Sequence, residues 1–289
     1  MKDPQRISAL INLLDDPDEQ IYSQVSQELL SFGEQIVKQL EEAWENSFDE
    51  ILQFRIEQII HQIQFQEVKK RLQIWNQDPK ASLLDAAIAI AHYQYSDVDE
   101  TYIRNFVDQL KQDCWIEVND NYTAMEKVGI VNKIFFDIYG FRGDKKHFHS
   151  PSNSFINNVV EGRKGNPISI SLLYLEIARH LKLPIYGVNL AEHFVLAYLE
   201  VPIEFIDEVN KEDVLFYINP FNKGTLFQYS EIETFVKDLK IDMQEQFYLP
   251  CDKLTVVQRM LNNLIFCYYQ NGETEKIEEL KILKNCLKK

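Results

Sequence analysis

The chain has 289 residues, and its 30 Lys and Arg against 45 Asp and Glu give a formal net charge of −15. This negative excess argues against a general nucleic-acid binder or a protein of anionic membrane surfaces, because both need a positive field to attract phosphates. A hydrophobic fraction of 45% indicates an ordinary globular chain. No secretory segment opens the sequence and no apolar run approaches the roughly 20 residues of a membrane span, so we expect a cytoplasmic protein.

The four cysteines lie far apart, without a CxxC pair, at Cys114, Cys251, Cys267 and Cys286. A chain of this length needs no disulfide scaffold. We therefore expect free thiols, and the apolar neighbours of Cys114 and Cys267 predict that these two are buried as small hydrophobic residues.

Residues 1–78 show helical periodicity and no strand signal. Ile21, Val25 and Leu29 recur every four residues, and an isoleucine-rich stretch at 51–63 continues the pattern. Short helices joined by turns are typical of stacked hairpins. We therefore predict a HEAT-like helical region over residues 1–78.

A strongly apolar helix is predicted over residues 167–182. Pro167 suits its first turn, because a backbone N–H at that position would have no acceptor within the helix, and proline has no N–H to lose. Apolar residues occur on nearly every side, so the helix should be central and covered. Before it come further predicted helices, the last over 122–138, and a loop-like stretch rich in Gly, Asn, Ser and His at 141–166, a length often used for function.

Short strand-like runs follow this helix at 185–190, 193–201 and 214–218, and the last one ends in a turn signal. A buried helix beside a small antiparallel sheet is an α+β core, which we assign to residues 79–249.

The last stretch, residues 250–289, returns to a helical pattern that is interrupted by Asn271 and Gly272. This pattern predicts a single helical hairpin resembling a TPR unit. One such unit cannot bury its apolar face alone, so we expect it to dock on the core or on a partner.

Five sequence pieces occur in a fixed order between residues 135 and 227. They are YGFRG at 139–143, SPSNSF at 150–155, RKGNPISISLLY at 163–174, EHFVL at 192–196 and YINPFNKG at 217–224. Together they resemble the SirB-type branch of the transglutaminase-like superfamily, whose fold is related to papain. The resemblance implies a transglutaminase/papain-like core, and bacterial relatives carry a HEAT-like N-terminus and a TPR-like tail.

Active members of that superfamily place a cysteine at the start of the central helix, a histidine on a following strand and an aspartate or asparagine on the next. Carried onto this chain, the resemblance implies His193 as the histidine and Asn219 as the third residue, whose amide oxygen can still accept the imidazole N–H. The helix start holds no cysteine. Ser169 is one of two hydroxyls there, and it is better explained as a helix cap than as a nucleophile. The resemblance therefore implies a degenerate site.

Residues near the helix start are candidates for a ligand-binding cleft: Asn153, Arg163, Asn166 and Glu192. Arg163 brings positive charge ahead of the positive end of the helix, an arrangement that attracts anions, although the spacing lacks the GK[ST] of a P-loop. His147 and His149 suit either a metal pair or a loop pair lining the cleft. Zinc needs three or four ligands, so we expect no metal and no cofactor.

Three functions remain open. The first is a non-catalytic protein whose cleft binds a peptide or protein segment, with no nucleic-acid or membrane partner. The second is a hydrolase or acyl transferase that uses Ser169 or Ser171, with His193 as base and Asn219 orienting it. The third is a scaffold whose cleft is filled by its own side chains. The retained imidazole without a thiol favours the first.

Overall fold

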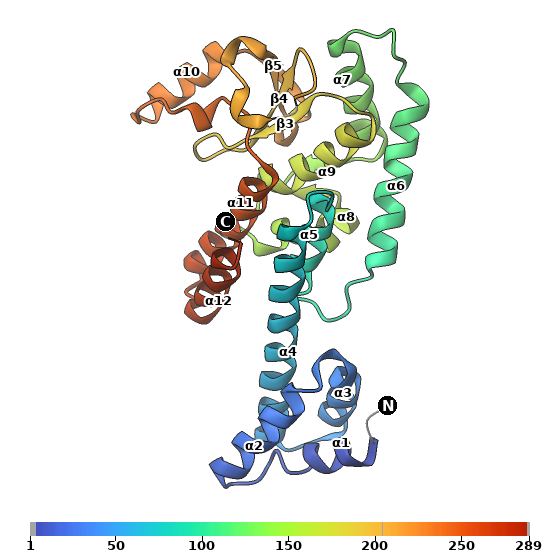
Figure 1. The fold of residues 1–289 in the computed structure, drawn as a ribbon, viewed down its shortest axis with the longest axis vertical. Coiled ribbons are helices and arrows are strands. Elements are labelled where there is room, and N and C mark those ends of the chain that lie inside the picture. The colour runs from blue at the N-terminus through green and yellow to red at the C-terminus, as the bar shows by residue number, and fades with distance from the viewer. Residues whose placement is uncertain (1–3, 204, 288–289) are drawn as a thin grey trace.

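A computed structural model describes residues 4–203 and 205–287 of the chain, and it is mostly helical with a small antiparallel sheet (Figure 1). The predicted α+β class is confirmed. The helices are α1 (Pro4–Ile11), α2 (Glu19–Leu30), α3 (Val37–Asn46), α4 (Glu50–Gln77), α5 (Leu83–Ala91), α6 (Glu100–Glu117), α7 (Ala124–Asn132), α8 (Ile156–Gly162), α9 (Pro167–His180), α10 (Tyr229–Asp238), α11 (Lys253–Asn271) and α12 (Thr274–Asn285). The strands are β1 (Arg142–Gly143), β2 (Lys164–Gly165), β3 (Ile185–Val188), β4 (Val195–Leu199), β5 (Val214–Asn219) and β6 (Thr225–Phe227). None of the helices in these ranges combines the length and apolar character needed to cross a membrane.

The N-terminal helices α1, α2 and α3 gather around the first half of α4 at one end of the molecule (Figure 1). Asp49 caps α4 by accepting hydrogen bonds from two backbone N–H groups of its first turn. Ile56 and Ile63 of α4 belong to the core of this N-terminal part, whereas Val68 and Leu72 belong to the main core. One continuous helix thus joins the two cores, and it ends next to the predicted boundary at residue 78.

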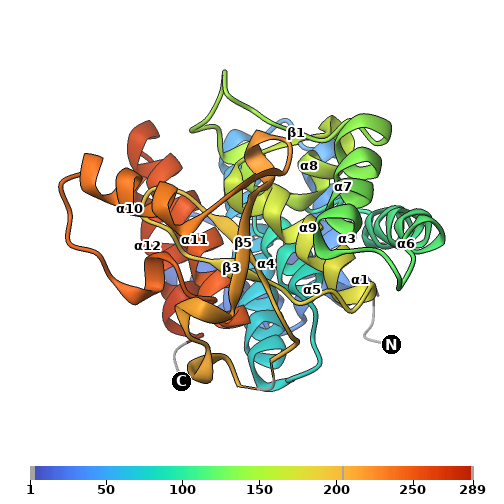
Figure 2. The ribbon, with the colours of Figure 1, turned by 90° about the horizontal axis from the view of Figure 1, so that it is seen from above.

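Helix α9 is central, as its apolar sequence predicts. Every residue from Pro167 to Ala178 is buried. It is contacted by helices α5, α6, α8 and α11 and by strands β3 and β4. Figures 1 and 2 show α6 and the C-terminal hairpin on opposite sides of α9. The apolar residues around the whole helix are explained by this complete cover.

The main sheet has the strand order β3-β4-β5-β6, with every neighbouring pair antiparallel. The first three strands match the predicted runs, but His193 lies in the turn before β4 and does not begin the strand. Residues 141–166 are not one continuous loop, because they contain α8 and a short parallel pairing of β1 with β2. Ile156, Val159 and Val160 anchor α8 in the core.

The C-terminal hairpin docks on the core, as its unpaired apolar face predicts. Leu261 and Leu264 of α11 and Leu280 of α12 share the main core with residues of α9. Helix α12 also contacts α4, where Glu279 accepts a hydrogen bond from the His61 ring at 2.8 Å. Glu279 accepts another from Tyr93, which follows α5, at 2.7 Å.

The Glu279 contact predicts a pH-dependent stability. Burial opposes ionisation, but the hydrogen bonds from His61 and Tyr93 hold the pKa of Glu279 below 4.5, its ordinary value. A carboxylate with a lower pKa in the folded state stabilises fully above its unfolded pKa and less as the pH falls below it. We expect Glu279→Gln to cost roughly 1 kcal/mol at neutral pH. Urea unfolding at about pH 7 and about pH 3 should show this difference shrink in acid; a constant difference would contradict it.

Candidate functional site

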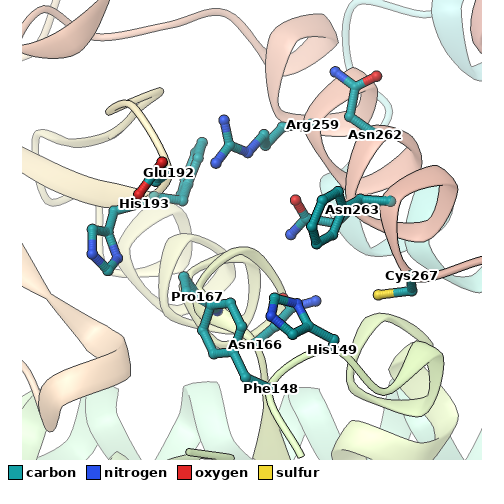
Figure 3. A pocket seen from close by; sticks show the side chains of 12 residues that line it. Phe148, His149, Asn166, Pro167, Glu192, His193, Arg259, Asn262, Asn263 and Cys267 are labelled. Atoms are coloured by element: carbon teal, nitrogen blue, oxygen red, sulfur yellow. The ribbon is translucent and has the colours of Figure 1, made fainter. Parts of the chain in front are cut away.

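A cavity of about 640 Å³ opens beside the N-terminal end of α9 (Figure 3). Four segments far apart in the sequence form its walls: a loop, the start of α9, the turn before β4 and one face of α11. The lining residues are Phe148, His149, Asn166, Pro167, Glu192, His193, Phe194, Arg259, Asn262, Asn263, Phe266 and Cys267. The volume lies within the range of small-ligand and peptide side-chain pockets.

The start of α9 is held by a closed set of hydrogen bonds. The Ser169 hydroxyl donates to the Asn153 carbonyl at 2.7 Å and accepts the Asn166 backbone N–H at 3.0 Å. In return, the Asn166 side chain accepts the Ser169 N–H at 2.9 Å and donates to the Ser154 hydroxyl at 2.8 Å. Ser169 is only 1% exposed. Its hydroxyl therefore acts as a helix cap, as the sequence suggests.

This role predicts a stability defect for Ser169→Ala. The substitution removes the hydroxyl that bonds to both the Asn166 N–H and the Asn153 carbonyl, and it leaves these buried groups only their direct hydrogen bond of 3.3 Å, so it should cost about 1 kcal/mol. Urea denaturation measures the loss. Ser152→Ala is the control, because Ser152 is exposed and, among the described residues, its hydroxyl bonds only to the Ser150 hydroxyl. Equal stability of Ser169→Ala and wild type would contradict the capping role.

His193 is half-buried at the cavity wall, with its ring 5.0 Å from the Phe235 ring of α10. Burial lowers the pKa of His193 below 6.5, its ordinary value; Glu192 opposes this shift and Arg259 adds to it. The imidazole is thus mainly neutral at neutral pH. Within residues 4–203 and 205–287, its ring nitrogens form no hydrogen bond.

Asn219 ends β5 as predicted. The register that pairs Leu196 with Ile218 places Asn219 opposite Val195, two residues from His193. The Asn219 side chain accepts the Asn222 N–H at 3.2 Å, so it caps the turn after β5. The fold brings the two residues to neighbouring strand ends, but no hydrogen bond of the described chain joins His193 to Asn219 or to Ser169.

Ser171 offers no second nucleophile. Its side chain is completely buried in α9 and does not line the cavity, and its hydroxyl has no hydrogen-bond partner among the described residues. The contact between a serine oxygen and the imidazole that a serine hydrolase needs is therefore not formed by either serine.

Of the four residues predicted to line the cleft, two line the cavity and two do not. Asn166 and Glu192 line the cavity. Asn153 is buried and does not line it, and its side chain donates to the His147 carbonyl at 2.7 Å. Arg163 lies elsewhere, with its guanidinium 3.8 Å from the centre of the Phe106 ring.

Of the two loop histidines, His149 lines the cavity and packs against Phe266, whereas His147 lies 3.5 Å from the Asp144 carboxylate. Across the described ranges, no group of three or more His, Cys, Asp or Glu side chains is placed to hold a metal ion.

Sequence reasoning missed the wall supplied by α11. Arg259 and Asn263 point toward the cavity from that helix, and the exposed Asn262 also lines it (Figure 3). Their spacing of three and four residues is the signal that could have found them, because it places polar side chains on one face of an otherwise apolar helix.

Cys267 lies one turn further along the same face. Burial raises the pKa of the Cys267 thiol to about 11. A thiol with such a pKa is protonated at neutral pH and is a poor nucleophile. Cys267 therefore does not replace the cysteine that the start of α9 lacks.

Comparison with known proteins agrees with this architecture. A UPF0162 protein of Xylella fastidiosa (strain 9a5c) is 28% identical over 220 residues, covering 71% of this chain and 73% of that protein. F-box only protein 21 of Mus musculus is 27% identical over 155 residues, covering 52% of this chain and 23% of the mouse protein. No solved structure gives a significant match. Residues 101–262 match the family described as the transglutaminase-like superfamily. This range is more than half of the sequence and holds every lining residue of the cavity except Asn263, Phe266 and Cys267. The chain belongs to that superfamily.

Proposed function

We propose that this protein is a non-catalytic member of the superfamily whose cavity binds a peptide or protein segment. One observation carries the proposal: the residues at the start of α9 that face the cavity are Asn166 and Pro167, which offer neither a thiol nor a hydroxyl. A chain that keeps the cavity and His193 without a nucleophile retains the means to bind and lacks the means to form an acyl intermediate.

The chemistry of the lining supports a ligand. His149, His193, Asn262 and Asn263 have no side-chain hydrogen bond within the part of the chain that the structure describes, although all four face the cavity. Polar side chains at a concave site usually have partners, so this group is suited to partners that come from outside. An open cavity also argues against a scaffold that fills the cleft with its own side chains.

The flanking helices fit the same role. We propose that the chain divides into a HEAT-like region at 1–78, a transglutaminase-like core at 79–249 and a TPR-like hairpin at 250–289, as in the SirB-type branch, and that it acts in the cytoplasm. Helical repeats of these kinds commonly present binding surfaces. In the mouse relative, the matched segment is only 23% of the protein, so this core is combined there with other sequence.

A peptide array tests the proposal. The full chain, carrying a fluorescent label, is incubated with random peptides, and captured sequences are measured again with His193→Ala. We expect at least a tenfold loss of binding. His180→Ala is the matched control, because that histidine is exposed at the far end of α9 and should leave binding unchanged. Capture of no peptide by folded wild type, or equal capture by His193→Ala, would contradict the proposal.

A further inference from the structure

The α11 wall of the cavity contains a positive charge, that of Arg259, without a negative partner among the described residues. With 45 acidic and 30 basic residues in the chain, carboxylates are plentiful as partners for cations. Arg71, Arg104 and Arg179 each form an ion pair with Asp or Glu. Arg259 is half-buried, yet no carboxylate of the described residues lies within 4.0 Å of its guanidinium.

Among the described residues, the guanidinium of Arg259 has one hydrogen-bond partner, the neutral side-chain oxygen of Asn189 at 3.2 Å. A guanidinium offers five N–H donors in a planar fork, so most of them stay unused. Removing a charge from water without a counter-charge costs free energy. A ligand that carries its own negative charge would remove this cost.

The neighbouring amides complete a set of donors. Asn262 and Asn263 follow Arg259 on the same face of α11, and neither side chain has a hydrogen-bond partner among the described residues (Figure 3). Carboxamide N–H groups beside a guanidinium can bind both oxygens of a planar carboxylate. A single Arg suits this singly charged group better than a phosphate.

Glu192 sets a limit on where the anion can lie. This exposed carboxylate faces the same cavity from the turn before β4, and its charge acts on His193. It repels an anion placed near His193, so the favoured position is against Arg259 and the two amides.

We propose that the α11 wall anchors a carboxylate of the bound peptide, either a C-terminal carboxylate or an Asp or Glu side chain. This inference deepens the proposed function and rests on it. It names an acidic anchor as the feature that the cavity selects.

The test uses one set of peptide sequences on an array in three forms. The forms are peptides with a free C-terminal carboxylate, the same peptides with a C-terminal amide, and the same peptides with Asp and Glu replaced by Asn and Gln. We expect wild type to lose at least tenfold in binding on one altered form, which also identifies the source of the carboxylate. Equal binding of all three forms would overturn the inference while leaving the proposed function standing. Capture of no form at all would overturn both.

Variants assign the effect to α11. Arg259→Met should bind carboxylate and neutral forms equally, within about twofold, and Glu192→Gln should strengthen binding of the carboxylate form. Asn262→Ala, at an exposed position that tolerates alanine, should reduce the discrimination about threefold even if Arg259→Met does not fold. Lys281→Met is the matched control, because this lysine lies on α12 outside the cavity. Full discrimination by both Arg259→Met and Asn262→Ala would overturn the inference.

Discussion

Glu176→Ala should lower the free energy of unfolding by about 3–5 kcal/mol, because it removes one partner of a buried charge cluster. Glu176 lies in the middle of α9 and is 2% exposed. One of its oxygens accepts the backbone N–H groups of Leu83 and Leu84 at 3.0 and 3.4 Å. These donors at the start of α5 have no partner within that helix. The other lies 2.9 Å from the Arg179 guanidinium and 3.6 Å from the Lys111 ammonium.

The loss should be mainly electrostatic. Without Glu176, the largely buried Lys111 keeps only Asp108 among the described residues, and the N–H groups of Leu83 and Leu84 lose their carboxylate acceptor. Glu176→Gln preserves the size and one acceptor, so it should cost less than Glu176→Ala. Glu278→Ala is the control, since this exposed residue pairs only with Lys281 in its own helix and should change stability by less than about 0.5 kcal/mol. Urea unfolding measures all three, and a loss below about 1 kcal/mol for Glu176→Ala would refute the cluster's importance.

Gly224→Ala should cost about 3 kcal/mol, because the added methyl group meets two separate penalties. Gly224 has a φ of +69°, which L residues with a side chain rarely adopt. A Cβ there would also overlap the Asn132 side chain. That side chain donates to the Gly224 carbonyl at 2.9 Å and accepts the hydroxyl of Tyr174, which is completely buried, at 3.0 Å.

Gly272→Ala separates the two penalties. Gly272 has a similar φ of +77°, but no atom lies within 4 Å of a Cβ built there. Its substitution should cost only about 1 kcal/mol, the strain of the left-handed conformation. Thermal or urea unfolding of the two variants gives the difference directly. Equal losses would show that the contact between Asn132 and the turn after β5 contributes nothing.

The parts of the fold that the sequence predicts well are those in which local pattern and burial agree. Helix α9 is apolar on all sides and is covered on all sides, and the strand-like runs became β3, β4 and β5. Ser169 could be identified as a cap because capping depends only on residues within one helical turn.

The local sequence pattern predicts the secondary structure wrongly where contacts with distant parts of the chain determine it. The sequence of α8 predicts a loop because Asn157 and Asn158 interrupt its short apolar face, although three apolar residues anchor this helix in the core. The predicted strand begins at His193, two residues before β4 does, because Glu192, with a φ of +57°, extends the turn that precedes β4. The spacing of apolar residues along the sequence shows neither the core contacts of α8 nor the backbone conformation of Glu192.

The candidate site shows the same limit. His193, Glu192 and Asn166 were found because they belong to sequence pieces that resemble a known family. Arg259 was not, because nothing in its local sequence tells that the C-terminal hairpin packs beside the start of α9. The helix that closes the cavity is distant in the sequence, and only the packing of the core brings it there.

The central claim is that the cavity binds a peptide without changing it. The most direct measurement incubates the full chain with peptides that it captures and follows both molecules by mass spectrometry, with His193→Ala in parallel. The account predicts that wild type binds the peptides while the masses of peptide and protein stay constant over a long incubation. Cleavage, deamidation or a covalent adduct that wild type forms and His193→Ala does not would contradict it.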